Sequence, residues 1–182
     1  MHEIVSTILD DSAIRAGADR LRAEPSVRFA GLWGSADAII TAALSHHLDR
    51  PVLIVVRNDD EAEELADDLE LFAEATTDRL VPWEAALADD RLSEEVTGER
   101  LRLCRALTSD APPRFVVTSI LALLQPVPDQ AALRSGELTL SAGQTLEIDD
   151  LLGWLVDAGY ESVEQVDAVG EFAHRGGIVD IL

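Results

Sequence analysis

The sequence contains no lysine, a single cysteine and few aromatic residues. All 14 basic residues are arginines and 35 residues are acidic, so the formal net charge is −21. DNA binding relies on clustered cations that displace counterions from phosphates, and we therefore expect no direct nucleic-acid binding by this chain. The one thiol, Cys104, excludes an internal disulfide and a zinc site built from several cysteines. Its apolar neighbours at helical spacing predict a buried side chain instead.

Long apolar runs are absent as well. The runs at 52–56 and 120–124 are far shorter than the ~20 residues that a membrane span requires. The N-terminus lacks the basic start and the apolar stretch of a secretory signal. The sequence therefore predicts a cytoplasmic protein that has no membrane partner.

Metal-binding and catalytic motifs are likewise missing. His46 and His47 are adjacent, so a helix would point them apart, whereas a helix chelates metal through histidines at the i, i+4 spacing. The many carboxylates include no pair beside a nucleophile or base in a recognisable motif. We therefore expect no catalytic residue, no metal site and no cofactor in this chain.

Strands and helices alternate over residues 1–125, which predicts a parallel sheet with helices on both faces. Asn58 before three acidic residues is typical of a helix N-terminus, and the apolar run 52–56 is typical of a strand buried on both faces. The expected strands are 29–32, 52–56 and 115–118. The expected helices are one or two over 4–22, one from the cap residue Ser35 to Leu48, and others over 59–73 and 98–107. A last helix over 120–124 would be capped by Thr118 or Ser119.

A domain boundary is expected at Pro126-Val127-Pro128-Asp129, because two prolines remove backbone donors and restrict the residues before them. After it, 137–140 and 145–148 alternate like short strands, and a helix with apolar residues from Leu151 to Val156 stops at Gly159. The apolar strand 177–182 ends without a following partner, which suggests a fragment of a longer protein. The predicted fold is a P-loop NTPase-like α/β domain over 1–125, followed by a smaller α+β domain over 126–182 that is cut short.

A phosphate-binding loop is expected at 31–38, between a strand and a helix. A working loop reads GxxxxGK[ST], in which glycine admits the phosphate, lysine neutralises it and a hydroxyl holds Mg²⁺. Those three positions carry Ala36, Asp37 and Ala38, and no other lysine can substitute. Trp33 within the loop is expected to cap the adjacent core. The predicted inactive loop consists of Gly31, Gly34, Ser35, Ala36, Asp37 and Ala38.

Several segments, taken in order, resemble the N-terminal, UvrB-like region of the bacterial transcription-repair coupling factors (Mfd). The segments are 31–38, Pro82-Trp83-Glu84, Arg91-Leu92-Ser93, Gly98-Glu99-Arg100-Leu101, 121–128, Gly159-Tyr160 with Gln165-Val166, and 170–180. Their joint order is much more specific than any one of them, and together they span about residues 29–182. The repair protein UvrB is similar over the same region but would carry an intact loop with its lysine, so the resemblance favours the coupling factors.

The resemblance implies a helicase-derived first domain that has lost its ATP site and a second domain that recruits the nucleotide-excision repair protein UvrA. It implies that the chain is not an enzyme by itself, whereas the full-length protein would be an ATP-dependent DNA translocase that displaces stalled RNA polymerase. The implied partners are UvrA and the other domains of the same full-length protein. By resemblance, Arg175 would contact UvrA, together with His174 and Phe172 in the same motif.

Alternatives stay open at the level of sequence. Arg175 could pair with Glu171 on its own hairpin, and Glu161 stands where relatives often carry an arginine, which would alter the contact surface. The chain could also be an autoinhibitory or structural domain that packs on the motor, or a nucleotide-binding domain.

Overall fold

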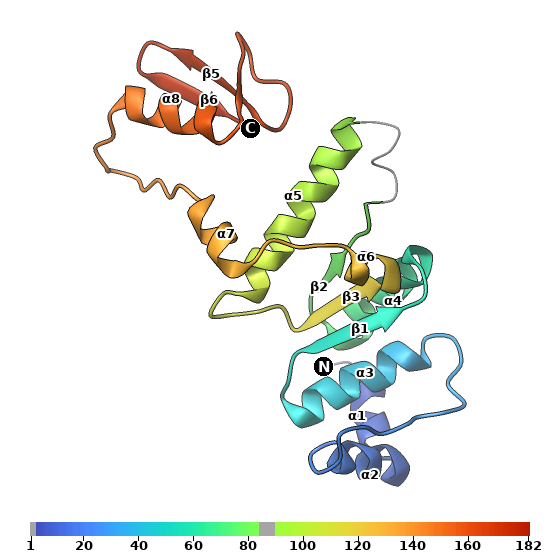
Figure 1. Cartoon of the computed structure of the whole chain (residues 1–182). Helices are drawn as coiled ribbons and strands as arrows, with labels where there is room; N and C mark the ends of the chain where they lie inside the picture. The colour runs from blue at the N-terminus through green and yellow to red at the C-terminus, as the bar shows by residue number, and fades with distance from the viewer. Residues whose placement is uncertain (1–2, 84–89) are drawn as a thin grey trace. The chain divides into compact units, whose positions relative to one another are not determined.

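The computed structural model describes residues 3–83 and 90–182, and it divides into two compact units, Met1–Pro128 and Asp129–Leu182 (Figure 1). The sequence analysis places the domain boundary after residue 125, within the segment that connects the two units. Glu84 of the resembling motifs lies outside the described residues, as do the side chains of Arg91, Leu92 and Ser93. Each unit is mixed α and β, which confirms the predicted fold class.

Two short helices and a longer one begin the first unit. They are α1 (Glu3–Asp10), α2 (Ser12–Arg20) and α3 (Ala36–Leu48). Asp11 separates the first two, because its carboxylate caps α2 by accepting bonds from Ala13 N and Ile14 N at 2.8 and 3.1 Å. The two helices expected over 4–22 are therefore confirmed.

The strand expected at 29–32 is wrong, because these residues belong to no strand of either sheet. Gly31 has a φ of +78°, which interrupts a strand conformation. The ring of Phe29 lies directly over Gly17 of α2, where an added Cβ would come within 2.7 Å of it. Packing on a helix thus replaces pairing in the sheet, and only glycine leaves room for that ring.

The sheet of the first unit has three parallel strands in the order β1-β3-β2, namely β1 (Val52–Val56), β2 (Thr77–Leu80) and β3 (Phe115–Ser119). Strand β3 is buried along its whole length, as a central strand should be. The sequence analysis does not anticipate β2, because Thr77-Asp78-Arg79 lacks an apolar pattern. The predicted parallel sheet is confirmed.

Helices lie on both faces of this sheet. Arg79 of β2 forms an ion pair of 2.9 Å with Asp59, at the start of α4 (Asp59–Ala73). The adjacent Asp78 points to the opposite face of the sheet, where its carboxylate lies 3.9 Å from the guanidinium of Arg102 in α5 (Asp90–Leu107). As predicted, Asn58 caps α4 by accepting a 2.9 Å bond from Glu61 N. Helix α5 begins before the expected residue 98, and Cys104 within it is buried as expected.

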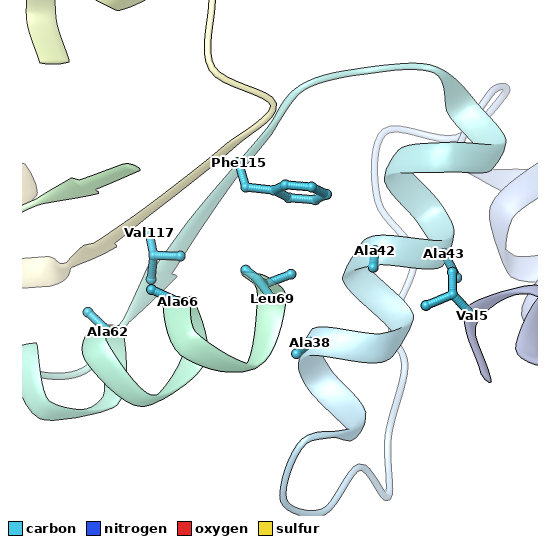
Figure 2. Close-up of a cluster of buried hydrophobic side chains, with 9 residues drawn as sticks. All are labelled: Val5, Ala38, Ala42, Ala43, Ala62, Ala66, Leu69, Phe115 and Val117. Carbon is cyan, nitrogen blue, oxygen red and sulfur yellow. The ribbon is translucent and has the colours of Figure 1, made fainter. Parts of the chain in front are cut away.

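The main core lies between β3 and the helices α1, α3 and α4 (Figure 2). Figure 2 shows Val117 of β3 beside Ala66 of α4, the ring of Phe115 extending past Leu69 toward α3, and small alanine side chains on both helices. Those alanines let the helix backbones approach closely, and Leu69 fills the centre with no exposed surface. The buried cluster consists of Val5, Ala38, Ala42, Ala43, Ala62, Ala66, Leu69, Phe115 and Val117.

Strand β1 corrects one expectation. Its five residues alternate, so that Leu53 and Val55 are 57% and 44% exposed while their neighbours pack on the core. The run of apolar residues therefore does not mark a strand buried on both faces.

The short helix α6 (Ile120–Leu124) follows β3, and Ser119 Oγ caps it by accepting a 3.3 Å bond from Ala122 N, as predicted.

The second unit contains two helices and a three-stranded sheet. Its elements are α7 (Gln130–Ser135), α8 (Ile148–Asp157), β4 (Glu161–Ser162), β5 (Glu171–Arg175) and β6 (Ile178–Ile181). Strand β5 lies centrally, parallel to β4 and antiparallel to β6. Leu151 and Leu155 of α8 pack against Phe172 to form a separate core. The helix predicted to stop at Gly159 is confirmed, because this glycine follows the cap residue Ala158 with a φ of +92°.

The strands expected at 137–140 and 145–148 are wrong. Both segments lie outside regular structure up to Ile148, which instead begins α8. A turn does form between them, since Gln144 N donates to Ser141 O at 3.1 Å and Ser141 N donates to Gln144 Oε1 at 3.1 Å. The alternating Leu138 and Leu140 are exposed, so no apolar face is buried there to stabilise strands.

Within the described ranges, no helix combines the length and the apolar character that crossing a membrane requires.

Candidate functional site

The altered phosphate loop has the backbone of a tight turn before α3. Gly31 and Gly34 have φ values of +78° and +55°, and Ala36 N donates to Trp33 O at 3.2 Å. Glycine adopts such angles without the steric cost that a side chain would bring. The turn thus follows the expected order of loop and helix, although no strand precedes it.

The three positions that would bind phosphate and magnesium lie at the start of α3. Ala38 is fully buried in the core, Asp37 is exposed, and Ala36 is the first residue of the helix. A hydroxyl at position 38 would therefore face the core of this unit. Ser35 occupies the N-cap position but its side chain makes no cap hydrogen bond, so the expected serine cap is wrong.

Trp33 does not cap the core, contrary to expectation. Its side chain is 86% exposed on the loop between Gly31 and Gly34. The indole therefore lies mostly in solvent and does not cover the core.

A cavity of about 690 Å³ opens beside this loop. It lies where the loop meets the carboxyl end of β1 and the first turns of α4, the usual position of a ligand pocket in an α/β sheet. Its charged lining residues are Asp37, Arg57, Glu61, Glu64, Asp67 and Asp68. Five carboxylates and one guanidinium make this lining repel a nucleotide phosphate.

The guanidinium in that lining is itself engaged by Glu61. Arg57 Nη2 and Nε both donate to the Glu61 carboxylate, with an Nε to Oε2 distance of 3.1 Å, and Arg57 N donates to the same Oε2 at 3.2 Å. The hydrogen bond from Arg57 lowers the pKa of Glu61 below its ordinary value, and Glu61 raises the pKa of Arg57. The pair therefore stays ionised at neutral pH and offers little positive charge to an anion.

Of this lining, the sequence pointed only to Gly34, Ser35 and Asp37, because the recognisable motif is the loop alone. A signal was available, since residues that follow a parallel strand meet the neighbouring loop at the carboxyl edge of the sheet. Arg57 follows β1 directly, and Glu61 and Glu64 lie one and two turns into the helix that comes next.

In the second unit, the predicted partner residues lie on the hairpin of β5 and β6. The turn consists of Gly176 and Gly177, since Arg175 pairs with Ile178, and Gly176 has a φ of +62°. His174 and Arg175 are exposed, and His174 Nε2 donates to Gly176 O at 2.5 Å. The hairpin therefore presents a cation beside a tight turn.

Arg175 also holds the loop before β5. Its Nη2 donates to Glu164 O at 2.5 Å. Glu171 at the other end of the strand accepts bonds from Asp167 N and Ala168 N at 2.8 and 2.9 Å. Two charged side chains of one strand thus order the loop 163–170 through its backbone.

Phe172 lies differently from its two motif neighbours. It is 3% exposed and packs against Leu151 and Leu155, so it supports the strand from the core and does not reach the surface. Glu161 is exposed on β4, in register with Glu171 of β5. An acidic side chain therefore stands on the surface of the same sheet that carries Arg175.

Residues 138–182 match a family model described as the UvrB interaction domain. The match begins after α7 and covers the whole of the second sheet, with Arg175 included. The match is therefore confined to the second unit and does not extend over the parallel sheet or the loop at 31–38.

The curated relatives to which the chain is similar are transcription-repair-coupling factors. The factor of Bacillus subtilis is 32% identical over 154 residues, covering 84% of this chain and 13% of the relative. The factor of Mycobacterium bovis is 37% identical over 156 residues, covering 81% of this chain and 12% of the relative. The factor of Myxococcus xanthus is 30% identical over 171 residues, covering 90% of this chain and 14% of the relative.

These matches confirm the resemblance. Over most of its length, the chain is similar to the N-terminal, UvrB-like region of the transcription-repair-coupling factors. It spans only 12 to 14% of the length of those relatives.

Proposed function

We propose that this chain is a non-catalytic recruitment module of a transcription-repair coupling factor, and that its second unit binds UvrA. The observation that carries the proposal is the UvrB interaction domain match over 138–182, which contains the exposed Arg175 hairpin. In this proposal the ATP-dependent DNA translocase activity resides in parts of the full-length protein outside this chain. The module then brings the repair protein to stalled RNA polymerase.

The chemistry of Arg175 supports its role as the contact residue. One guanidinium N–H is engaged by Glu164 O, and an exposed arginine keeps further donors for a carboxylate of the partner. The bond to Glu164 O also limits the rotamers of Arg175, so less side-chain entropy is lost on binding. Arg175 is one of two arginines in this unit, the other being Arg134 on α7.

A binding measurement with purified UvrA tests the proposal. We expect the unsubstituted chain to bind and Arg175→Ala to lose on the order of 2 kcal/mol, about 30-fold in Kd, as at interface hot spots. Arg134→Ala is the matched control, because it removes the other exposed arginine of the unit and the same charge. We expect that control to bind as the unsubstituted chain does.

Two results would overturn the proposal. If the unsubstituted chain fails to bind UvrA at micromolar concentrations, the recruitment role is wrong for this chain. If Arg175→Ala and Arg134→Ala weaken binding equally, general charge and not the hairpin carries the interaction. Circular dichroism of each variant separates loss of binding from loss of folding.

The exposed apolar surface of β1 supports a second role, structural packing on other domains of the full-length protein. Leu53 and Val55 leave one side of β1 uncovered, and Leu124 of α6 is 77% exposed. Apolar side chains grouped in this way mark surfaces that other chains or domains cover. The test is the double substitution Leu53→Ser and Val55→Ser in the full-length protein. If packing on β1 masks the second unit, the substitution should increase UvrA binding. If the packing is only structural, UvrA binding should stay unchanged.

A further inference from the structure

Three segments that the sequence analysis singled out meet beyond the carboxyl ends of β2 and β3. They are Pro82-Trp83 after β2, Arg100 in α5, and Gln125-Pro126 after α6. Arg100 is only 2% exposed, and its guanidinium lies 4.3 Å from the centre of the Trp83 ring. The recruitment proposal assigns no role to any of these residues.

Arg100 connects two backbone segments that are far apart in the sequence. Its Nη1 donates to Val81 O at 2.6 Å, and its Nη2 donates to Pro126 O at 3.3 Å. A planar guanidinium can bridge two carbonyl oxygens in this way, whereas the single ammonium of lysine cannot reproduce the same fork. One side chain therefore ties the exit of β2 to the segment that follows α6.

Trp83 adds a second tie to the same segment. Its backbone N–H donates to Gln125 Oε1 at 2.9 Å, and its indole Nε1 donates to Thr97 Oγ1 at 3.3 Å. The backbone N–H of Gln125 is bonded to Ala122 O at the end of α6. Gln125 is thus held through both its side chain and its backbone.

The burial of Arg100 is costly, which makes a purely space-filling role a poor explanation. Burial lowers the pKa of Arg100, because the charged form loses its hydration. Its hydrogen bonds are to neutral carbonyl oxygens, which offset the lost hydration less than a carboxylate would. An apolar side chain of similar volume would fill the same space at lower cost, so the hydrogen bonds themselves must supply the benefit.

The segment that Arg100 holds is stiff. Pro126 and Pro128 have fixed φ angles and no backbone N–H, and the carbonyl oxygen of Pro126 accepts the bond from Arg100. Proline-rich segments keep their direction over several residues. The hydrogen bond at Pro126 O therefore also restricts the backbone direction of the next residues, which lead into the second unit.

We propose that Arg100 is the positioning residue of a linker clamp, formed by Trp83, Arg100, Gln125 and Pro126, that fixes the direction in which the chain leaves the first unit. This inference does not rest on UvrA binding. It gives a structural role to three motifs that the recruitment proposal leaves unused.

Nitrogen-15 relaxation of the whole 182-residue chain tests the clamp directly. The probes are the amides of Val127 and Asp129, which follow the clamped carbonyl. We expect order parameters of ~0.85 in the unsubstituted chain and a fall below ~0.6 in Arg100→Met, which keeps the volume and removes the donors. Arg100→Lys should not restore the order, because it keeps the charge without the fork.

Controls separate the clamp from general stability. Arg102→Met removes an exposed arginine from the same helix and should leave both order parameters unchanged. Gln125→Ala removes the acceptor for Trp83 N without touching Arg100, and it should also mobilise Val127 even if Arg100→Met fails to fold. The proposal is overturned if Val127 keeps its order in Arg100→Met or in Gln125→Ala, or if it is already mobile in the unsubstituted chain.

Discussion

A single side chain changes what the loop before α3 can bind. In a working phosphate loop a lysine would neutralise the anion, whereas Asp37 here adds a negative charge beside four other carboxylates of the cavity. The engaged Arg57 does not reverse that balance, because Glu61 accepts two of its side-chain N–H donors. At the residue scale, then, the absence of a lysine and the five carboxylates of the lining both disfavour a bound phosphate.

The Arg57–Glu61 pair predicts a pH dependence of stability. Because the pKa of Glu61 is lowered in the folded state, the pair stabilises the fold above the pKa of an unfolded glutamate, near 4.5, and this contribution is lost as pH falls through the folded pKa. We expect Glu61→Gln to be less stable than the unsubstituted chain at pH 7 and equally stable once pH lies below both values. Urea unfolding at several pH values from 3 to 7 measures the difference.

A double-mutant cycle assigns that effect to the pair. In an Arg57→Gln background, Glu61→Gln should change the pH dependence much less. If the change is as large without Arg57, the hydrogen bond from Arg57 does not cause it.

At the scale of elements, the sequence predicted those whose signals are local. Asn58 before three acids located the start of α4, because an N-cap depends on the residues beside it. Strand β2 was not predicted, because its polar Asp78 and Arg79 are stabilised by α5 and α4, which are distant in sequence. The strand prediction at 137–140 was wrong for the opposite reason. The alternation of apolar residues can be read locally, but a strand also needs a partner surface that buries its apolar face, and within the described ranges none covers Leu138 and Leu140.

The same limits apply to the candidate site. The loop 31–38 and Arg175, whose roles stay predictions, were singled out because each lies in a contiguous motif. The cavity lining and the clamp were not, because α4, α5 and the segment after α6 come together only through the sheet. The core position of Phe172 depends on α8 in the same way.

The same glycine-to-alanine substitution is expected to have opposite effects inside α8, at Gly153, and just after its C-terminus, at Gly159. Gly153 is exposed inside the helix with open space around it, so Gly153→Ala should stabilise the second unit by up to about 1 kcal/mol through lower chain entropy. Gly159 has a φ of +92°, so Gly159→Ala should destabilise it by about 1 to 2 kcal/mol. Thermal unfolding of both variants checks the sign. Destabilisation by Gly153→Ala, or none by Gly159→Ala, would contradict these backbone conformations.

At the scale of the whole molecule, the described residues form two buried hydrophobic clusters that have no residue in common. One is centred on β3 and α4, and the other is formed by α8 and β5. Pro126 and Pro128 lie between them, in the segment that the proposed clamp holds. The proposed recruitment role would benefit from a second unit that is stable by itself, because a partner then binds a formed surface without an ordering cost.

Separate cores predict that damage to one leaves the other folded. Leu69 and Leu155 are both at most 1% exposed, one in each core, and truncation of such a leucine costs about 2 to 5 kcal/mol. We expect Leu69→Ala to speed amide exchange throughout β1 and β3 while β5 and β6 keep their protection, and Leu155→Ala to do the reverse. Leu71→Ala, on the exposed side of the helix that carries Leu69, should change neither set. If Leu69→Ala accelerated exchange in both sheets equally, the chain would unfold as one cooperative body, and the second unit would depend on the first for the fold that presents Arg175.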